Sequence, residues 1–487
     1  MILSEYLQRG WQIARRSPLL AIGGVNAAMM ILSVVMSLVT VRLLAKAEYG
    51  QLVYFYTLFA PLRLFINFGL GFTISRDIAS AGQDRERLKV IASSMVFVRI
   101  IGTLTVSLLF AALSAVTDRP YLGFILAAAV ASSLADLVFA VIAGLRLVGA
   151  VGAMTAAQPV SYALFVLALA LSGQANATLL MSAYVLSFVV MLLLGLLILI
   201  RVGLIDVLSL SGFDWAYTRS GLLFAVPVYL SSLISQGWVS ITSGWLGWHQ
   251  QFQQAAEFGV VFNLISLIVS ISSPTLITTF YPHLSHLHKQ PGQGAQALHY
   301  IRGTLTLVLY GYVFVAVAFF SFPHTAVTLL FGNEYISSAA YLTILAPAII
   351  AIGAAPVFSF SLLATGRAWR LLIAQGLQLF ILVVILLALP YQVRSLDLAW
   401  AALISSIVGL IVQAAMLNYT LKVAVIPAGW WQMLLVGVGA ALLLRALASN
   451  IGITLSVWHF IAGGAFALVY WLRVLKLEGG LWGIKSS

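Results

Sequence analysis

The chain has 487 residues, of which 62% are hydrophobic and only 8% charged, with a mean hydropathy of +1.07. Soluble domains are about 25% charged and about 45–50% apolar, so this composition excludes an ordinary soluble protein and predicts an integral membrane protein. The formal net charge is +12, and the absence of cysteine excludes disulfides, thiolate metal sites and cysteine nucleophiles.

Apolar runs of about 20 residues recur along the whole sequence, and each is long enough to cross a hydrocarbon core of roughly 30 Å as a helix. The first run begins near Leu19 and lacks a cleavage site of the A-x-A kind, so it is interpreted as a retained span. Polar or turn-rich breaks divide the chain into fourteen predicted spans, and an even number places both termini on one side. These breaks fall near 46–50, 73–90, 117–120, 146–152, 172–178, 201–219, 245–256, 283–300, 322–336, 365–370, 390–397, 422–430 and 448–451.

Lysine and arginine are distributed unequally between alternate loops. One set of loops and termini holds eighteen of these residues and the other set holds five. Basic loops resist translocation, so the first set, which includes both termini, is predicted to be cytoplasmic. The positive charge then faces anionic lipid of the inner leaflet, and the sequence predicts membrane lipid and no nucleic acid as its neighbour.

Two short repeats indicate a duplicated architecture. Ala47-Glu48-Tyr49-Gly50 recurs as Ala256-Glu257-Phe258-Gly259 after 209 residues, and Gly144-Leu145-Arg146 resembles Thr365-Gly366-Arg367 after 221 residues. A longer outside loop around FGNEY in the second half explains the difference in offset. The predicted organisation is an N-terminal lobe over 1–200, a cytoplasmic linker over 201–221, a C-terminal lobe over 222–421, and two further spans with a cytoplasmic tail over 422–487.

Three charges fall inside predicted spans. Arg63 and Arg99, on consecutive antiparallel spans, both lie about 12 Å from the cytoplasmic boundary, and Asp136 on the fourth span lies roughly 8 Å from it. These groups either line a polar cavity for an anion, or snorkel or form a salt bridge that locks the helices. One carboxylate neutralises one guanidinium, so a surplus positive charge favours the cavity. A guanidinium also suits phosphate because it donates two parallel hydrogen bonds.

Other chemistry has little support in the sequence. There is no P-loop, HExxH or GxSxG motif, so no enzymatic activity and no cofactor are predicted. His283, His286 and His288 are interpreted as loop histidines and not as a metal site, because no acidic or thiolate ligand is near. Trp238, Trp245 and Trp248 flank an outside loop, where an interfacial belt is the expected role and sugar stacking the alternative.

The sequence resembles the polysaccharide (O-antigen-type) flippase branch of the multidrug/oligosaccharidyl-lipid/polysaccharide exporter superfamily. The resemblance covers most of the chain. It is carried by AEYGQLVYFYTLFAPLRLFINFGLGFTISRDIA (47–79), by the following QDRERLK, and by LLFGNEYISSAAYLTILAP with LLATGR (329–367). It implies an all-α membrane protein of about 14 helices, with two pseudo-symmetric six-helix lobes around a central cavity and two C-terminal helices.

The same resemblance implies export of polyprenyl-diphosphate-linked oligosaccharide units across the bacterial cytoplasmic membrane, for O-antigen or other polysaccharide synthesis. A polysaccharide polymerase and glycosyltransferases are the implied protein partners. Arg63 and Arg99 fit the cavity cations of the branch, and Arg42 and Arg76 are further candidates near span ends. The first span has Asn26 and Ser33 where murein-lipid flippases carry an arginine, which argues against lipid II as the substrate.

Two other hypotheses stay open. An ion-coupled multidrug antiporter of the same superfamily would use Asp136, the one acid within a predicted span, for coupling. A membrane scaffold would use no residue in the spans for transport. The flippase hypothesis predicts that replacing both Arg63 and Arg99 stops lipid-linked glycan from reaching the outer leaflet.

Overall fold

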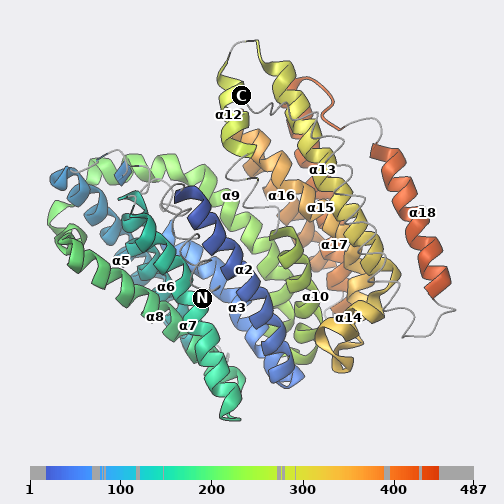
Figure 1. The fold of residues 1–487 in the computed structure, drawn as a ribbon, viewed down its shortest axis with the longest axis horizontal. Helices are drawn as coiled ribbons and strands as arrows, with labels where there is room; N and C mark the ends of the chain where they lie inside the picture. The colour runs from blue at the N-terminus through green and yellow to red at the C-terminus, as the bar shows by residue number, and fades with distance from the viewer. Residues whose placement is uncertain are drawn as a thin grey trace, which may run out of the picture. The chain divides into compact units, whose positions relative to one another are not determined.

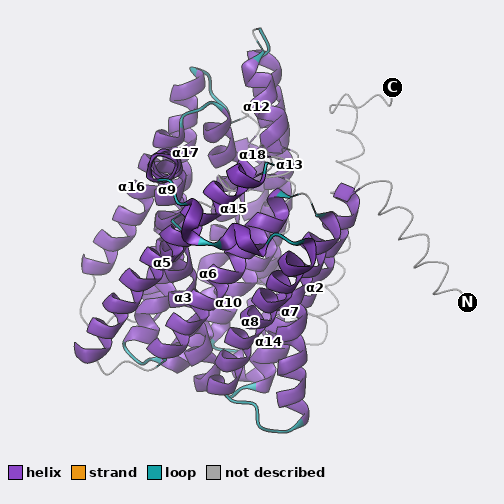
Figure 2. Ribbon diagram, turned by 90° about the vertical axis from the view of Figure 1, so that its left-hand side faces the viewer, coloured by secondary structure: helices purple, strands orange, loops and turns teal. Residues whose placement is uncertain are grey.

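The computed structural model describes residues 18–68, 77–78, 81, 84–116, 121–145, 147–270, 276, 280–290, 292–388, 395–426 and 430–448. Within these residues the regular structure is entirely helical (Figures 1 and 2). Ten of the described helices are long and apolar enough to cross a membrane. The chain is therefore a multi-pass membrane protein, and the predicted all-α fold is confirmed.

The helices follow the predicted spans closely. Each of the first thirteen spans contains a described helix, while the fourteenth, beyond residue 450, lies outside the described residues. The helices of the first half are α2 (Pro18–Leu43), α3 (Lys46–Asn67), α5 (Arg85–Val116), α6 (Leu122–Gly144), α7 (Val148–Leu171) and α8 (Ala177–Val202). Those that follow are α9 (Trp215–Trp248), α10 (Phe252–Ser270), α12 (Tyr281–Lys289), α13 (Gly294–Ser321), α14 (Pro323–Phe331), α15 (Ser338–Ala364), α16 (Ala368–Ala388), α17 (Ser395–Leu421) and α18 (Trp430–Ala448).

The chain divides into two compact units. The first comprises Met1–Gln236 with Gly247–Gln253, and the second comprises Gly237–Leu246 with Gln254–Ser487. The long helix α9 therefore contributes to both. The lobe boundaries drawn from the sequence repeats, at residues 200 and 221, stay a prediction.

Helix α6 forms the centre of the first unit. It packs against α8, α3 and α5, and most of its residues are buried. Small residues such as Ala128, Ala131 and Ala135 let the neighbouring helices approach closely. Two of the polar residues on this crowded helix are Ser133, which is buried, and Asp136, which is partly exposed.

The second unit repeats the helix pairings of the first. Helix α15 packs against α17 and α16 packs against α17, just as α6 packs against α8 and α7 against α8. Its apolar core includes Leu305, Leu309, Val357 and Phe358. These matching pairings are what a duplicated pair of lobes would produce.

Trp238 does not lie in an interfacial belt, so that expectation is wrong for this residue. Its side chain is buried in the second unit, its indole Nε1–H donates to Ser405 Oγ at 2.8 Å, and its ring centroid lies 5.8 Å from that of Phe262. An indole with a buried hydrogen-bond partner contributes to packing and needs no water interface.

The segment between α8 and α9 is ordered against α5 and is not a free tether. Two short 3₁₀ helices, η1 (Ile205–Leu208) and η2 (Leu210–Gly212), pack on α5. The rings of Phe213 and Phe97 lie 4.2 Å apart, and the Asp214 amide donates to Ser94 Oγ at 3.3 Å.

Two segments that were expected to be loops are helices. The first is α12, which carries His283, His286 and His288, and the second lies between α13 and α15. Pro323–Phe331 forms the helix α14 where a loop was expected. Proline is favourable at the first position of a helix, because its missing N–H would have no partner there in any case.

Candidate functional site

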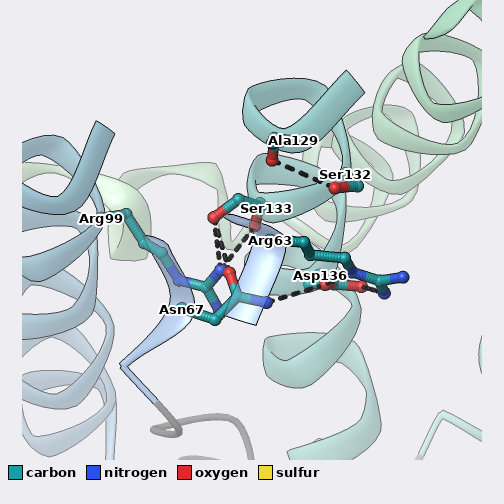
Figure 3. Close-up of polar contacts among 7 residues, drawn as sticks. All are labelled: Arg63, Asn67, Arg99, Ala129, Ser132, Ser133 and Asp136. Carbon is teal, nitrogen blue, oxygen red and sulfur yellow. Dashed lines mark hydrogen bonds and ion pairs between the residues drawn. The ribbon is translucent and has the colours of Figure 1, made fainter. Parts of the chain in front are cut away.

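Three neighbouring helices of the first unit bring five polar side chains together. Arg63 and Asn67 lie four residues apart on α3 and so share one helix face. Ser133 and Asp136 lie three residues apart on α6, and Arg99 comes from α5. Figure 3 shows these side chains converging between the helices. We call these five residues the polar network.

Arg63 and Asp136 form a two-point ion pair at the centre of the network. Arg63 Nε donates to Oδ2 of Asp136 at 2.8 Å, and Nη2 donates to Oδ1 at 2.6 Å. This fork geometry is the strongest arrangement that an arginine makes with a carboxylate. The pair is only partly enclosed, since the side chains of Arg63 and Asp136 are 35% and 20% exposed.

Asn67 and Ser133 extend the network from Asp136 to Arg99. Asn67 Nδ2 donates to Oδ2 of Asp136 at 3.1 Å, and Ser133 Oγ donates to Oδ1 of Asn67 at 2.7 Å. Arg99 Nη1 in turn donates to Oγ of Ser133 at 2.5 Å and to its carbonyl oxygen at 3.0 Å. The dashed lines in Figure 3 trace this path.

The network carries a surplus of positive charge. It contains two guanidinium groups and one carboxylate, and the carboxylate is held by Arg63. Arg99 is 3% exposed and donates to the uncharged oxygens of Ser133. A buried cation normally has a counter-ion, so this arrangement suits a site that receives an anion.

An aromatic cluster borders the ion pair. The ring of Tyr184 on α8 lies 4.9 to 5.7 Å from each of five other aromatic rings. One of these, Phe188, also lies 5.5 Å from Cζ of Arg63. The hydroxyl groups of Tyr56 and Tyr162 are hydrogen bonded at 2.9 Å. The five rings belong to Phe55, Tyr56, Phe59, Tyr162 and Phe188.

The sequence-predicted residues do not all meet. Arg63, Arg99 and Asp136, the three charges that the sequence placed inside spans, come together in one hydrogen-bonded network. Arg42 is exposed in the last turn of α2 and is not one of the five network residues. Arg76 lies outside the described residues.

Sequence reasoning missed Asn67, Ser133 and the aromatic cluster. Their signal was present in the spacing. Asn67 follows Arg63 by four residues and Ser133 precedes Asp136 by three, so each polar residue shares a helix face with a charge.

Two positions of the second half that match Ser133 and Asp136 carry apolar residues. The offset of 221 residues between Arg146 and Arg367 aligns Ser133 with Ala354 and Asp136 with Val357. Both of these residues are buried in the apolar core of the second unit. Duplication alone therefore does not account for Ser133 and Asp136, since these two described positions of the second half are apolar.

Comparisons with known proteins bear on family and fold. A family model described as polysaccharide biosynthesis protein matches residues 19–288. No curated protein sequence matches significantly.

Among solved structures, lipid II flippase MurJ in an inward closed conformation superposes with a TM-score of 0.68 at 11% identity, covering 95% of this chain and 99% of that one. A multidrug-resistance MATE transporter of the MOP superfamily, in an inward-facing conformation, gives 0.60 at 15% identity, covering 79% and 95%. A eukaryotic MATE transporter gives 0.58 at 14% identity, covering 89% and 100%. At these identities the likeness shows a shared fold.

Proposed function

Because the chain belongs to the polysaccharide biosynthesis protein family, we propose that it is a flippase for polyprenyl-diphosphate-linked oligosaccharide units. It moves them from the inner to the outer leaflet of the bacterial cytoplasmic membrane, where they supply O-antigen or another surface polysaccharide. The fold it shares with a lipid flippase and with transporters supports a transport role.

The observation that carries this proposal is the surplus positive charge of the polar network. A diphosphate brings negative charge that offsets the surplus positive charge of the network, and a guanidinium fork matches two phosphate oxygens. Arg63 is the accessible cation and makes the direct contact. Arg99 is almost fully buried and does not contact the substrate. It contributes positive potential to the site and, through its hydrogen bond to Ser133, acts as a positioning residue for the network. Arg42 and Arg76 are proposed as weaker contacts near the span ends.

Movement of the headgroup needs two conformations of the protein. We assign the rocking bodies to the lobes 1–200 and 222–421, joined by the cytoplasmic linker 201–221, with 422–487 as an appendage. The polyprenyl tail stays in lipid while the polar headgroup crosses, so the protein shields only the charged and hydroxylated part of the substrate. A polysaccharide polymerase and glycosyltransferases are the proposed partners, and both termini lie in the cytoplasm.

An ion-coupled multidrug antiporter is the alternative from the same superfamily. It would require Asp136 to bind a cation, but both carboxylate oxygens of Asp136 already accept hydrogen bonds from Arg63. A cationic drug would compete with a fixed guanidinium less than 3 Å away. This arrangement favours an anionic substrate.

The test is a double substitution, Arg63→Gln with Arg99→Gln, measured by the appearance of lipid-linked glycan in the outer leaflet. The flippase proposal expects normal insertion in the membrane and loss of transport. Ser132→Ala is the matched control, because Ser132 Oγ donates only to Ala129 O of its own helix among the hydrogen bonds of Figure 3. Unchanged transport in the double variant overturns the proposal. Drug efflux that is lost in Asp136→Asn supports the antiporter instead.

A further inference from the structure

The ion pair places a carboxylate where a substrate phosphate would bind. Asp136 accepts from Nε and Nη2 of Arg63 through two oxygens, at 2.8 and 2.6 Å. Two oxygens of a phosphate would use the same two N–H groups, since arginine forks bind carboxylate and phosphate alike. A phosphate that takes these same two N–H groups must displace Asp136, so substrate binding through this fork and the Arg63–Asp136 pair exclude each other.

The remaining members of the network are oriented to hold Asp136 without Arg63. Each hydrogen bond from Arg99 onward points the same way: Arg99 donates to Ser133, Ser133 donates to Asn67, and Asn67 donates to Asp136. Such an aligned chain polarises each successive group and brings part of the Arg99 charge to the carboxylate. After its ion pair with Arg63 is broken, Asp136 thus still accepts a hydrogen bond from Asn67, which is connected through Ser133 to the cation Arg99.

From this geometry we propose that Asp136 is an internal substitute for the substrate's phosphate. In the unloaded protein it occupies the donor fork of Arg63. An incoming diphosphate displaces it, and the Asn67–Ser133–Arg99 chain holds the released carboxylate. This inference rests on the proposed function, because it assumes that Arg63 binds the diphosphate.

The substitute has two consequences for transport. It weakens substrate binding, because only the fraction of molecules with an open Arg63 fork can bind, and the apparent dissociation constant rises in inverse proportion to that fraction. It also neutralises Arg63 when the headgroup has left, so the empty protein can return without a bare cation in its interior. Asp136 is therefore a positioning residue that sets both affinity and turnover.

The test measures binding of farnesyl diphosphate and of inorganic pyrophosphate to the full-length protein in lipid nanodiscs. Asp136→Asn keeps the shape of the side chain but cannot form the ion pair, and it is expected to tighten diphosphate binding by about tenfold, within the usual range of coupling between sites. Outer-leaflet delivery of lipid-linked glycan should slow in the same variant. Equal tightening for both probes assigns the effect to the diphosphate, and tightening for farnesyl diphosphate alone shows that the lipid tail must also be seated.

Asn67→Leu should act in the opposite direction. Without Asn67 the released carboxylate has no donor, so displacement is harder and diphosphate binding should weaken by about tenfold on the same scale. A purely structural role for the network predicts that both variants weaken binding. The opposite signs distinguish the two, and Asn67→Leu remains informative if Asp136→Asn does not fold.

Arg63→Gln separates failure of this inference from failure of the proposed function. If Arg63→Gln leaves diphosphate binding unchanged, the proposed function fails and the inference fails with it. If Arg63→Gln weakens binding while Asp136→Asn leaves it unchanged or weakens it, the inference alone is overturned. When Arg63→Gln is already present, adding Asp136→Asn should not change diphosphate binding further. The single variant Ser132→Ala should bind diphosphate as the wild type does.

Discussion

Ser133 and Asp136 lie three residues apart on α6, and each holds a different arginine. Ser133 accepts from Arg99 of α5, whereas Asp136 accepts from Arg63 of α3. A single turn of one helix thus fixes the positions of two cations that belong to two other helices. Substitutions at these positions should therefore alter transport and stability in separable ways.

The shape of the Arg63 side chain should matter as well as its charge. Arg63→Lys keeps the positive charge but cannot offer two parallel N–H groups, so we expect transport to fall by about tenfold, the effect of losing roughly 1.4 kcal/mol of a charge-assisted contact. Arg63→Gln should fall further. The rate of glycan appearance in the outer leaflet checks this, normalised to the amount of protein in the membrane. Equal activity of Arg63→Lys and wild type would contradict a role for the fork.

Two adjacent serines on α6 should respond differently to truncation. Ser133→Ala removes the hydroxyl that accepts from Arg99 and donates to Asn67, so each of these residues loses one hydrogen bond and we expect a loss of about 1–3 kcal/mol in the free energy of unfolding. Ser132→Ala removes a bond to its own helix and should cost less. Thermal unfolding of the two purified variants provides the comparison. A smaller loss for Ser133→Ala than for Ser132→Ala would argue against the network.

Gly50, the last residue of the repeated Ala-Glu-Tyr-Gly, should tolerate no side chain. A Cβ there would lie 1.7 Å from the carbonyl oxygen of Phe252. We expect Gly50→Ala to destabilise the protein by about 1–3 kcal/mol, as overpacking does. Gly123→Ala, with nothing within 4 Å of the added Cβ, should be neutral or stabilising because alanine favours a helix. Unfolding midpoints that are equal for the two variants would refute the close approach.

The absence of cysteine makes the proposed orientation directly testable. Gln174 is exposed between α7 and α8, and Ser211 is exposed in η2. We expect Gln174→Cys to react with a maleimide that cannot cross the cytoplasmic membrane when it is added to whole cells. Ser211→Cys should react only after that membrane is permeabilised. The reverse pattern would place both termini outside the cytoplasm.

The helices were located well from the sequence because a membrane span is identified by hydropathy along the chain and needs no knowledge of its neighbours. Hydropathy and the rise of a helix give the position of each span, and they placed Arg63, Arg99 and Asp136 inside spans, near the same predicted boundary. Which arginine forms an ion pair with Asp136 depends on how each helix is rotated about its own axis, and hydropathy does not give that rotation. The sequence left a cavity and a salt bridge open for that reason, and the structure pairs Arg63 with Asp136.

Other errors have the same origin. Trp238 was expected in an interfacial belt because it lies near a predicted loop, but its partner Ser405 is 167 residues away in the chain. The helix α14 was expected to be a loop because it lies in 322–336, one of the polar or turn-rich breaks between spans, and it is only nine residues long. Local patterns do not show contacts made by distant segments, and short helices fall below the length at which hydropathy identifies a span.

The contact of the 3₁₀ segment with α5 determines where the protein can be divided. A Cβ on Gly212 would lie 2.7 Å from Ser93 Oγ, and the ring of Phe213 lies against that of Phe97, so the 3₁₀ segment is part of the first unit's own packing. Ending the first half at residue 200 would remove these contacts and uncover that surface of α5. A first-half fragment made for reconstitution should therefore extend at least through Asp214, so that the 3₁₀ segment stays packed on α5.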